Sequence, residues 1–163
     1  MKTIGLLSDT HSKVDDRILD FFKDVDEIWH AGDIGNMDVV YRLEAIKPLR
    51  AVYGNIDGAE IRRSFKEVEI FKCENVNVLI IHIGGYPGKY APKVKELLKN
   101  NSSKLFICGH SHILKVMYDK ALGIMHINPG AAGMSGFHQV ITAMRFVVDN
   151  EEIKKMQILE IKR

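Results

Sequence analysis

The chain has 163 residues, of which 46% are hydrophobic and 27% are charged, a composition typical of a soluble globular protein with a substantial core. Its 23 basic and 21 acidic residues leave a net charge of +2, which argues against a nucleic-acid-binding surface built on bulk charge. No apolar run is long enough to span a bilayer, and Met1-Lys2 leads into the first predicted strand without a signal peptide. Cys73 and Cys108 share no metal-type spacing. Because neither a signal peptide nor a membrane span is predicted, we expect a protein of the reducing cytoplasm.

The first third of the chain alternates between predicted strands and helices. Residues 4–7 are a short apolar run, which indicates a strand buried on both faces, and apolar positions at helical spacing follow up to Phe22. Residues 27–30 and 49–53 predict two more strands, and Asn36 can cap a second helix between them. This order predicts a parallel sheet with right-handed crossovers, whose strand ends open on one edge.

The second half of the chain is richer in strands. A hairpin is predicted around Glu74-Asn75, and residues 92–98 predict a helix. Because no linker, internal repeat or low-complexity segment interrupts the chain, we expect one domain over residues 1–163. Two sheets packed together, with helices outside, would account for the number of strands. The predicted strands of this half are 68–71, 76–83, 105–107, 113–118, 124–128, 140–148 and 153–161.

Side chains that can bind metals follow several of these strands. His110 and His112 come after the run 105–107, and Gly109 lets the backbone turn sharply before them. Since side chains alternate on an extended chain, residues two apart at a strand end should point the same way. Ligands of open α/β sheets bind at the carboxyl ends of the strands. The residues that fall at such ends are Asp9, His11, Asp33, Asn55, His82, His110 and His112.

Seven oxygen and nitrogen donors could surround two divalent ions if one carboxylate bridged them. Two ions about 3.5–4 Å apart can clamp a phosphoryl group and lower the pKa of a bound water. A bridging hydroxide would then attack phosphorus in line, while the metals offset the charge that develops on oxygen. Mixed imidazole and carboxylate ligation without thiolate suits manganese, iron, zinc, nickel or cobalt better than calcium or magnesium.

Each candidate also has a purely structural interpretation when taken alone. Asp9 and Asn55 could cap turns, and Asp33 could close its own glycine loop. His82 could be a core histidine with satisfied hydrogen bonds, and His11 could cap the first helix. The two histidines after residues 105–107 could be turn residues that face solvent. The joint occurrence of all seven at strand ends favours a shared site.

The same residues, in this order, resemble the five motifs of the calcineurin-like metallophosphoesterases: Asp9-x-His11, Gly32-Asp33, Gly54-Asn55, His82 and Gly109-His110-x-His112. The short chain and Asn128-Pro129-Gly130 resemble the small YfcE-type phosphodiesterase branch of that superfamily. The resemblance implies an α/β fold, a four-layer αββα sandwich of two mixed β-sheets flanked by helices.

The resemblance also implies an activity and a distribution of ligands. The activity is hydrolysis of phosphoric esters, diesters more than monoesters, with two divalent transition-metal ions, of which Mn²⁺ is favoured over Ni²⁺, Zn²⁺, Fe²⁺ or Co²⁺. One ion would be bound by Asp9, His11, Asp33 and His112. The other would be bound by Asp33, Asn55, His82 and His110, with Asp33 as the bridge.

The chain departs from the wider superfamily at Ile56. The third motif there reads Gly-Asn-His, and its histidine is thought to donate a proton to the leaving group, which isoleucine cannot do. His30 and His126 lie near strand ends and are candidate substitutes, although packing or support of other residues suits them better. No role is assigned to His138.

A second function from a different class is a metal-binding protein-interaction scaffold with little catalysis, like a retromer subunit that resembles the same branch. The complete set of seven candidate ligands favours the enzyme. A small phosphodiester is the expected substrate, and a nucleotide, a lipid head group and a short oligonucleotide all stay open. We expect no membrane partner and no nucleic-acid partner other than a substrate, and the sequence leaves a homo-oligomer open.

Overall fold

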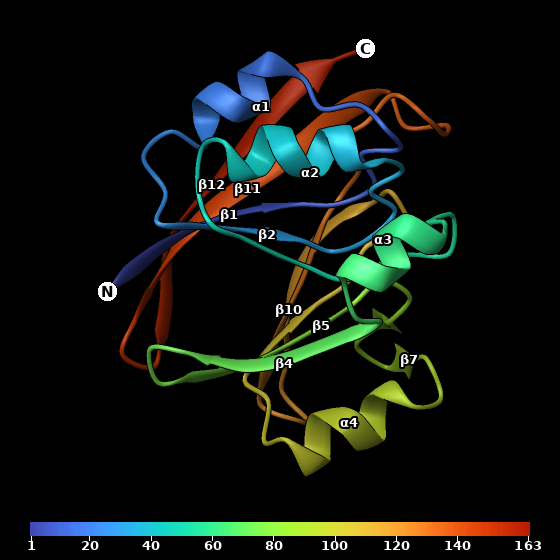
Figure 1. The fold of residues 1–163 in the computed structure, drawn as a ribbon. Coiled ribbons are helices and arrows are strands. Elements are labelled where there is room, and N and C mark those ends of the chain that lie inside the picture. The colour runs from blue at the N-terminus through green and yellow to red at the C-terminus, as the bar shows by residue number, and fades with distance from the viewer.

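The computed structural model describes residues 1–163 and consists of strands and short helices (Figure 1). In chain order they are β1 (Lys2–Leu7), α1 (Asp16–Phe21), β2 (Glu27–His30), α2 (Met37–Glu44), β3 (Leu49–Ala51), α3 (Ala59–Ser64), β4 (Val68–Cys73), β5 (Val76–Ile81), β6 (Gly85–Tyr86), β7 (Lys89–Tyr90), α4 (Val94–Asn100), β8 (Leu105–Ile107), β9 (Leu114–Asp119), β10 (Ile124–Pro129), β11 (Val140–Asp149) and β12 (Glu152–Lys162).

Two five-stranded sheets pack face to face, and this confirms the predicted four-layer sandwich. The first has the order β12-β11-β1-β2-β3 and the second the order β4-β5-β8-β10-β9. Helices α1 and α2 cover the outer face of the first sheet, and α4 covers the outer face of the second (Figure 1). Strands β1, β2 and β3 pair in parallel, as predicted, and β11 lies antiparallel beside β1, so the first sheet is mixed.

Three apolar clusters hold the layers together. The cluster between the sheets contains Ile4, Leu6 and the rings of Trp29 and Phe146, whose centroids lie 5.9 Å apart. A second cluster joins α1 and α2 to the first sheet, and a third joins α4 to the second sheet. Gly5 of β1 faces helix α1, where an added Cβ would lie 2.8 Å from the Phe22 ring. The glycine therefore allows the helix to pack closely on this strand.

The structure corrects several predicted bounds and adds elements. The third strand ends at Ala51 instead of residue 53, because Val52 forms only an isolated bridge with Lys66. Helix α4 begins at Val94, two residues after the predicted start. Helix α3 and the β6–β7 hairpin were not predicted, and the hairpin forms a small sheet of its own.

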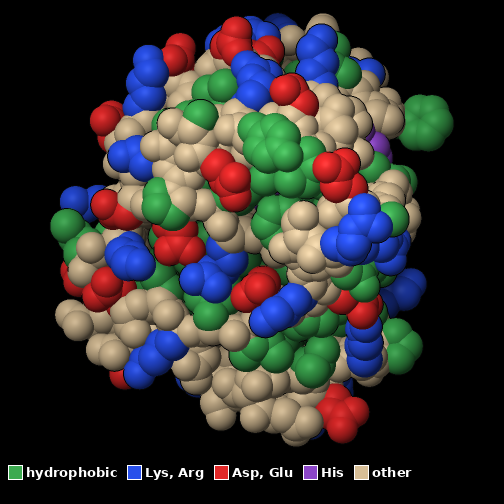
Figure 2. Space-filling model, viewed as in Figure 1, with side chains coloured by type: hydrophobic (Ala, Val, Ile, Leu, Met, Phe, Trp, Pro, Cys, Tyr) green, Lys and Arg blue, Asp and Glu red, His purple; other side chains and the backbone are tan.

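The surface charges, the helices and the cysteines are those expected from the near-neutral charge balance, the lack of long apolar runs and the cysteine spacing. Acidic and basic side chains are interspersed on the face shown in Figure 2. None of the four helices has the length and apolar character needed to cross a bilayer. Cys73 and Cys108 are both buried and unpaired.

Candidate metal centre

The candidate ligands lie in loops that follow β1, β2, β3, β5 and β8, where the carboxyl ends of parallel strands from both sheets meet. Backbone hydrogen bonds join these loops: the Asp9 N–H donates to the Gly32 carbonyl at 2.9 Å, and the Gly109 N–H donates to the His82 carbonyl at 3.0 Å. Six of the seven candidates form two groups whose ligand atoms lie within 4.8 Å of one another. The groups are Asp9, His11 and His112, and Asp33, His82 and His110.

Asp9 is held by one carboxylate oxygen and presents the other to the site. Its Oδ2 accepts hydrogen bonds from the Ser8 hydroxyl at 2.6 Å and from the His110 N–H at 3.1 Å. Its Oδ1 has no hydrogen-bond partner and lies 3.1 Å from His112 Nε2 in its own group. The same oxygen lies 3.8 Å from Nε2 of His82 in the other group. Asp9 therefore faces both groups.

Asp33 is arranged in the same way. Its Oδ1 accepts the Ile56 N–H at 3.0 Å, which leaves Oδ2 facing the centre. That oxygen lies 3.2 Å from His82 Nε2 in its own group and 3.6 Å from His11 Nε2 in the other. Asp33 thus lies between the groups, where a bridging ligand would be needed.

Five of the seven candidates have left-handed backbone conformations: φ is 55° for Asp9, 45° for His11, 54° for Asp33, 68° for His110 and 59° for His112. Such conformations cost non-glycine residues about 1–3 kcal/mol each and cluster at functional sites. The argument from alternation on an extended chain is therefore wrong, because none of these residues is extended. As a result, His110 and His112 belong to different groups.

The buried atoms at the centre fit a pair of metal ions. Asp9 Oδ1, His11 Nε2 and His82 Nε2 are buried and have no hydrogen-bond partner. Buried polar atoms are normally paired, so three unpartnered polar atoms close together fit a site that binds metal. The His82 Nδ1–H donates to the Ala31 carbonyl at 2.8 Å, and this tautomer leaves the Nε2 lone pair free for a metal. His82 is therefore not a core histidine with satisfied hydrogen bonds.

The charges of the site are mutually stabilising. Burial alone would raise the pKa of Asp9, but the His112 ring 3.1 Å from Oδ1, the nearby His82 and the hydrogen bond from Ser8 lower it overall. The pKa of Asp33 is likewise lowered, because the His82 ring 3.2 Å from Oδ2 and the hydrogen bond from the Ile56 N–H outweigh burial. Both aspartates are therefore ionised at neutral pH. The Asp9 carboxylate, whose Oδ1 lies 3.1 Å from Nε2, raises the pKa of His112, so metal binding there competes with protonation.

Asn55 lies next to the group formed by Asp33, His82 and His110. It is exposed and lines a small cavity together with His82. Its neighbour Gly54 packs against Asp33, since an added Cβ would lie 2.0 Å from Asp33 Oδ1. Its other neighbour, Ile56, donates the backbone N–H to that oxygen and exposes 46% of its side chain. The Asn55 loop is thus fixed against Asp33 through its backbone.

Asp57 is a supporting residue that the sequence analysis did not single out. Its buried carboxylate accepts the N–H groups of Gly54 at 2.7 Å, Ile34 at 3.1 Å and Gly35 at 2.7 Å. The first of these donors belongs to the Asn55 loop and the other two to the loop that carries Asp33. Asp57 therefore ties together two loops that hold candidate ligands.

Asp57→Asn is expected to lower metal affinity about 10–100-fold, the usual effect of losing a residue that orients ligands. An amide has only one acceptor oxygen, so it cannot accept all three N–H groups: Oδ2 accepts those of Ile34 and Gly54, and the Gly35 N–H that Oδ1 accepts would face an NH₂ group. Calorimetric titration of the metal-free variant with Mn²⁺ measures this loss. The matched control is Asp26→Asn, which removes a carboxylate that accepts the Thr3 N–H at 2.7 Å, away from the site. Equal Mn²⁺ affinities for the two variants would contradict this role for Asp57.

Two further residues support the Gly109–His112 loop. The Asn128 amide donates to the Gly109 carbonyl at 2.8 Å and to the Ser111 hydroxyl at 3.0 Å. His138, to which the sequence analysis gave no role, lies with its ring 5.2 Å from that of His112 and donates from Nε2 to the Gly133 carbonyl at 2.8 Å. Both roles depend on tertiary contacts that no local motif reveals.

His30 is unsuited to donate a proton to a leaving group. It is fully buried, and its Nδ1 accepts the Gly32 N–H at 3.1 Å. Its Nε2 therefore carries the proton and donates to the Thr10 hydroxyl at 2.9 Å, which in turn donates to the Ile34 carbonyl at 2.9 Å. Burial lowers its pKa to about 4. His30 instead fixes the loop that carries Asp9.

His126 is also neutral at pH 7. It is 1% exposed and stacks on Phe106 with ring centroids 5.0 Å apart. Burial lowers its pKa to about 4 from an ordinary value of 6.5. A neutral imidazole is not an effective general acid, so neither histidine replaces the one that Ile56 lacks.

The lowered pKa of His126 predicts a pH dependence of stability. Because the unfolded chain binds the proton more tightly, folding should lose up to about 1.4 kcal/mol per pH unit as the pH falls from about 6.5 towards 4. His126→Phe keeps an aromatic ring on Phe106 and removes the titrating group. Urea unfolding of the metal-free proteins at pH 7, 6 and 5 should show a shallower loss for the variant. Parallel curves for the two proteins would contradict the assignment.

The family of the chain follows from comparison with known sequences. The sequence model of the calcineurin-like phosphoesterase superfamily domain matches residues 1–151. The chain belongs to this superfamily. A probable metallophosphoesterase of Methanothermobacter thermautotrophicus is 33% identical over 138 residues, which cover 78% of this chain and 76% of that protein.

Solved structures of this superfamily fold agree with the architecture. Vps29 from Entamoeba histolytica, in complex with Zn²⁺, superposes with a TM-score of 0.76 at 16% identity and covers 98% of each chain. YfcE, a phosphoesterase from E. coli, superposes with a TM-score of 0.65 at 18% identity, over 95% of this chain and 98% of its own. At these identities the likeness shows the fold alone. The chain is thus a metallophosphoesterase-family protein with candidate metal-binding residues.

Proposed function

We propose that this protein hydrolyses phosphodiesters with two divalent transition-metal ions, with Mn²⁺ favoured. The observation that carries the proposal is the convergence of three buried, unpartnered ligand atoms on one point: Asp9 Oδ1, His11 Nε2 and His82 Nε2. The proposed ligands of one ion are Asp9, His11, Asp33 and His112, and those of the other are Asp33, Asn55, His82 and His110. Mixed imidazole and carboxylate donors suit Mn²⁺ and its neighbours in the transition series.

The residues of the chain prepare the site for this chemistry. Two divalent ions, when bound, supply the positive charge that stabilises phosphoryl transfer and makes water a nucleophile at neutral pH. The Ile56 N–H and the Asp57 carboxylate hold the loops of Asp33 and Asn55 in place before any ligand binds. The Ala31 carbonyl fixes the His82 tautomer. Neither His30 nor His126 is suited to act as a general acid, so ester groups that leave without protonation should react best.

The test is a panel of phosphodiesters and phosphomonoesters with the same 4-nitrophenyl leaving group, offered to the Mn²⁺-loaded protein. We expect turnover of the diester and a lower kcat/KM for the monoester. Turnover of the monoester alone would replace the proposal with a phosphomonoesterase.

A cytoplasmic location is also part of the proposal, and the two buried, unpaired cysteines support it.

A metal-binding interaction scaffold is the second candidate function. It is favoured by strand β9, which lies at the edge of its sheet and exposes 41% of Val116, 44% of Met117 and 56% of Tyr118. Exposed apolar side chains on an edge strand are suited to a protein partner. This candidate predicts metal binding without turnover of any ester in the same panel.

A further inference from the structure

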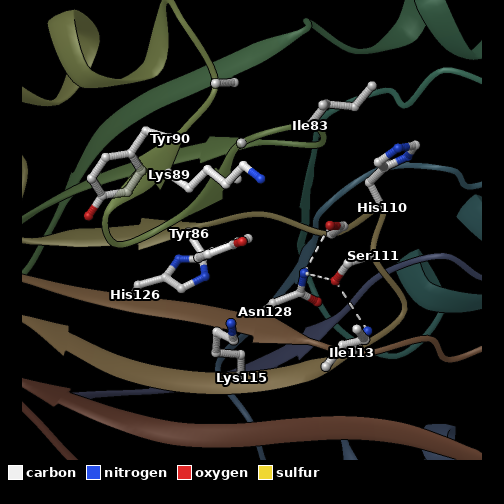
Figure 3. Close-up of a pocket in the computed structure, with 14 residues that line it drawn as sticks. Ile83, Tyr86, Lys89, Tyr90, His110, Ser111, Ile113, Lys115, His126 and Asn128 are labelled. Carbon is white, nitrogen blue, oxygen red and sulfur yellow. Dashed lines mark hydrogen bonds between the residues drawn. The ribbon is translucent and has the colours of Figure 1, made fainter.

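A cavity of about 440 Å³ lies beside the candidate metal centre (Figure 3). His110, a candidate ligand, lines it together with Gly109 and Ser111. The opposite wall is the β6–β7 hairpin, which contributes Tyr86 and Lys89. An ester group of a substrate held at the metal centre could therefore extend into this cavity.

The lining of the cavity is positively charged. Lys89 and Lys115 line it from opposite sides (Figure 3), and no aspartate or glutamate does. Neither lysine forms an ion pair with any residue of the chain. Two unpaired ammonium groups at one concave surface favour a ligand with negative charge.

The walls of the cavity are also aromatic and apolar. The rings of Tyr86 and Tyr90 line it, and Ile83 and Ile113 lie at the end nearest His110 (Figure 3). The Lys115 ammonium lies 4.2 Å from the centroid of the Tyr86 ring, so charge and ring are presented together. Flat apolar walls of this kind suit a planar aromatic group.

Two features fix the walls in place. The Tyr90 hydroxyl donates to Asp119 Oδ2 at 2.5 Å, which orients its ring. His126 lines the cavity, is 1% exposed, and is held by stacking on the Phe106 ring, with centroids 5.0 Å apart.

We propose that this cavity binds one ester group of the phosphodiester substrate, and that this group is a planar aromatic ring with a negative charge of its own. The proposal rests on the proposed phosphodiesterase activity and adds its substrate class. The ring would lie against Tyr86, and its charge would pair with Lys89 and Lys115. The metal centre would receive the phosphodiester beside His110.

Three 4-nitrophenyl diesters test this substrate class, because they share a leaving group and differ in the other ester group: methyl, phenyl or 3-carboxyphenyl. In the Mn²⁺-loaded protein we expect kcat/KM to rise from methyl to phenyl to 3-carboxyphenyl, by about tenfold in the last step, the worth of one charge-assisted contact. Lys115→Met and Lys89→Met should each reduce the ratio of 3-carboxyphenyl to phenyl. Lys99→Met, an exposed lysine of α4 outside the cavity, should leave the ratio unchanged. If both cavity variants keep the wild-type ratio, the proposal is overturned.

Binding to the metal-free protein separates this proposal from the activity on which it rests. Benzoate should shift the methyl NMR signals of Ile83 and Ile113 at concentrations about tenfold lower than benzyl alcohol, which lacks the charge, or cyclohexanecarboxylate, which lacks the aromatic ring. Lys115→Met should weaken the two carboxylates, benzoate and cyclohexanecarboxylate, and leave binding of benzyl alcohol unchanged. If benzoate binds no better than the other two, the aromatic anion is excluded, whether or not any diester is cleaved. If benzoate binds as expected and no diester is cleaved, only the proposed activity fails.

Discussion

Asp33→Asn is expected to weaken binding of both metal ions and to reduce diester turnover by more than about 100-fold, since even residues that only orient ligands contribute 10–100-fold. The reason is the position of Asp33 Oδ2, 3.2 Å from His82 Nε2 and 3.6 Å from His11 Nε2, in two different ligand groups. An amide at this position carries no charge and offers a single oxygen. Calorimetric Mn²⁺ titration and kcat/KM on the same samples measure both effects.

Two matched variants sharpen this experiment. His112→Ala removes a member of one group only, so it should affect mainly one ion. Asp9→Asn tests the other carboxylate that faces both groups, since Asp9 Oδ1 lies 3.1 Å from His112 Nε2 and 3.8 Å from His82 Nε2. If Asp9→Asn removes both ions while Asp33→Asn removes only one, then Asp9 is the bridge and the assignment of Asp33 is wrong.

A steep dependence of the rate on leaving-group pKa is the second large effect expected. A positioned proton donor contributes about 10²–10⁴-fold and matters most for poor leaving groups. The Ile56 side chain has no proton to give to a leaving group. The buried histidines His30 and His126 are neutral at pH 7, because burial lowers the pKa of each to about 4. Aryl diesters should therefore be cleaved well and alkyl diesters poorly. The measurement is kcat/KM across diesters of graded leaving-group pKa.

Ile56→His should flatten this dependence, because the side chain at this position is 46% exposed and has room for an imidazole. Ile56→Asn is the control, since it adds polarity at the same backbone position without an acid. The backbone N–H that holds Asp33 is kept in both variants. A shallow slope already in the wild type would mean that another group supplies the proton.

Much of the fold was predictable from local patterns, and the exceptions have physical reasons. The buried strands β1 and β8 are continuous apolar runs, and α2 has an Asn36 cap that accepts the Val39 N–H. Helix α3 spans six residues and the strands β6 and β7 two each, too few for any period to show. The pairing of β11 beside β1 joins distant parts of the chain, which no local pattern specifies.

The candidate ligands could be predicted, but their grouping from the residues alone could not. Each ligand follows a strand or a glycine, which the sequence displays. The left-handed backbones of His110 and His112 place the two rings in different groups, whereas an extended backbone, as predicted from the sequence, would point both rings the same way. The role of Asp57 depends on three N–H groups from two loops, which only the folded chain brings together.

The most direct test of a two-metal phosphodiesterase is the rate of bis(4-nitrophenyl) phosphate hydrolysis as Mn²⁺ is added stepwise to the metal-free protein. The site described here predicts that the rate rises until about two equivalents per chain are bound and then stays constant, with bound metal measured on the same samples. Full activity at one equivalent, or no turnover with two equivalents bound, would contradict the account.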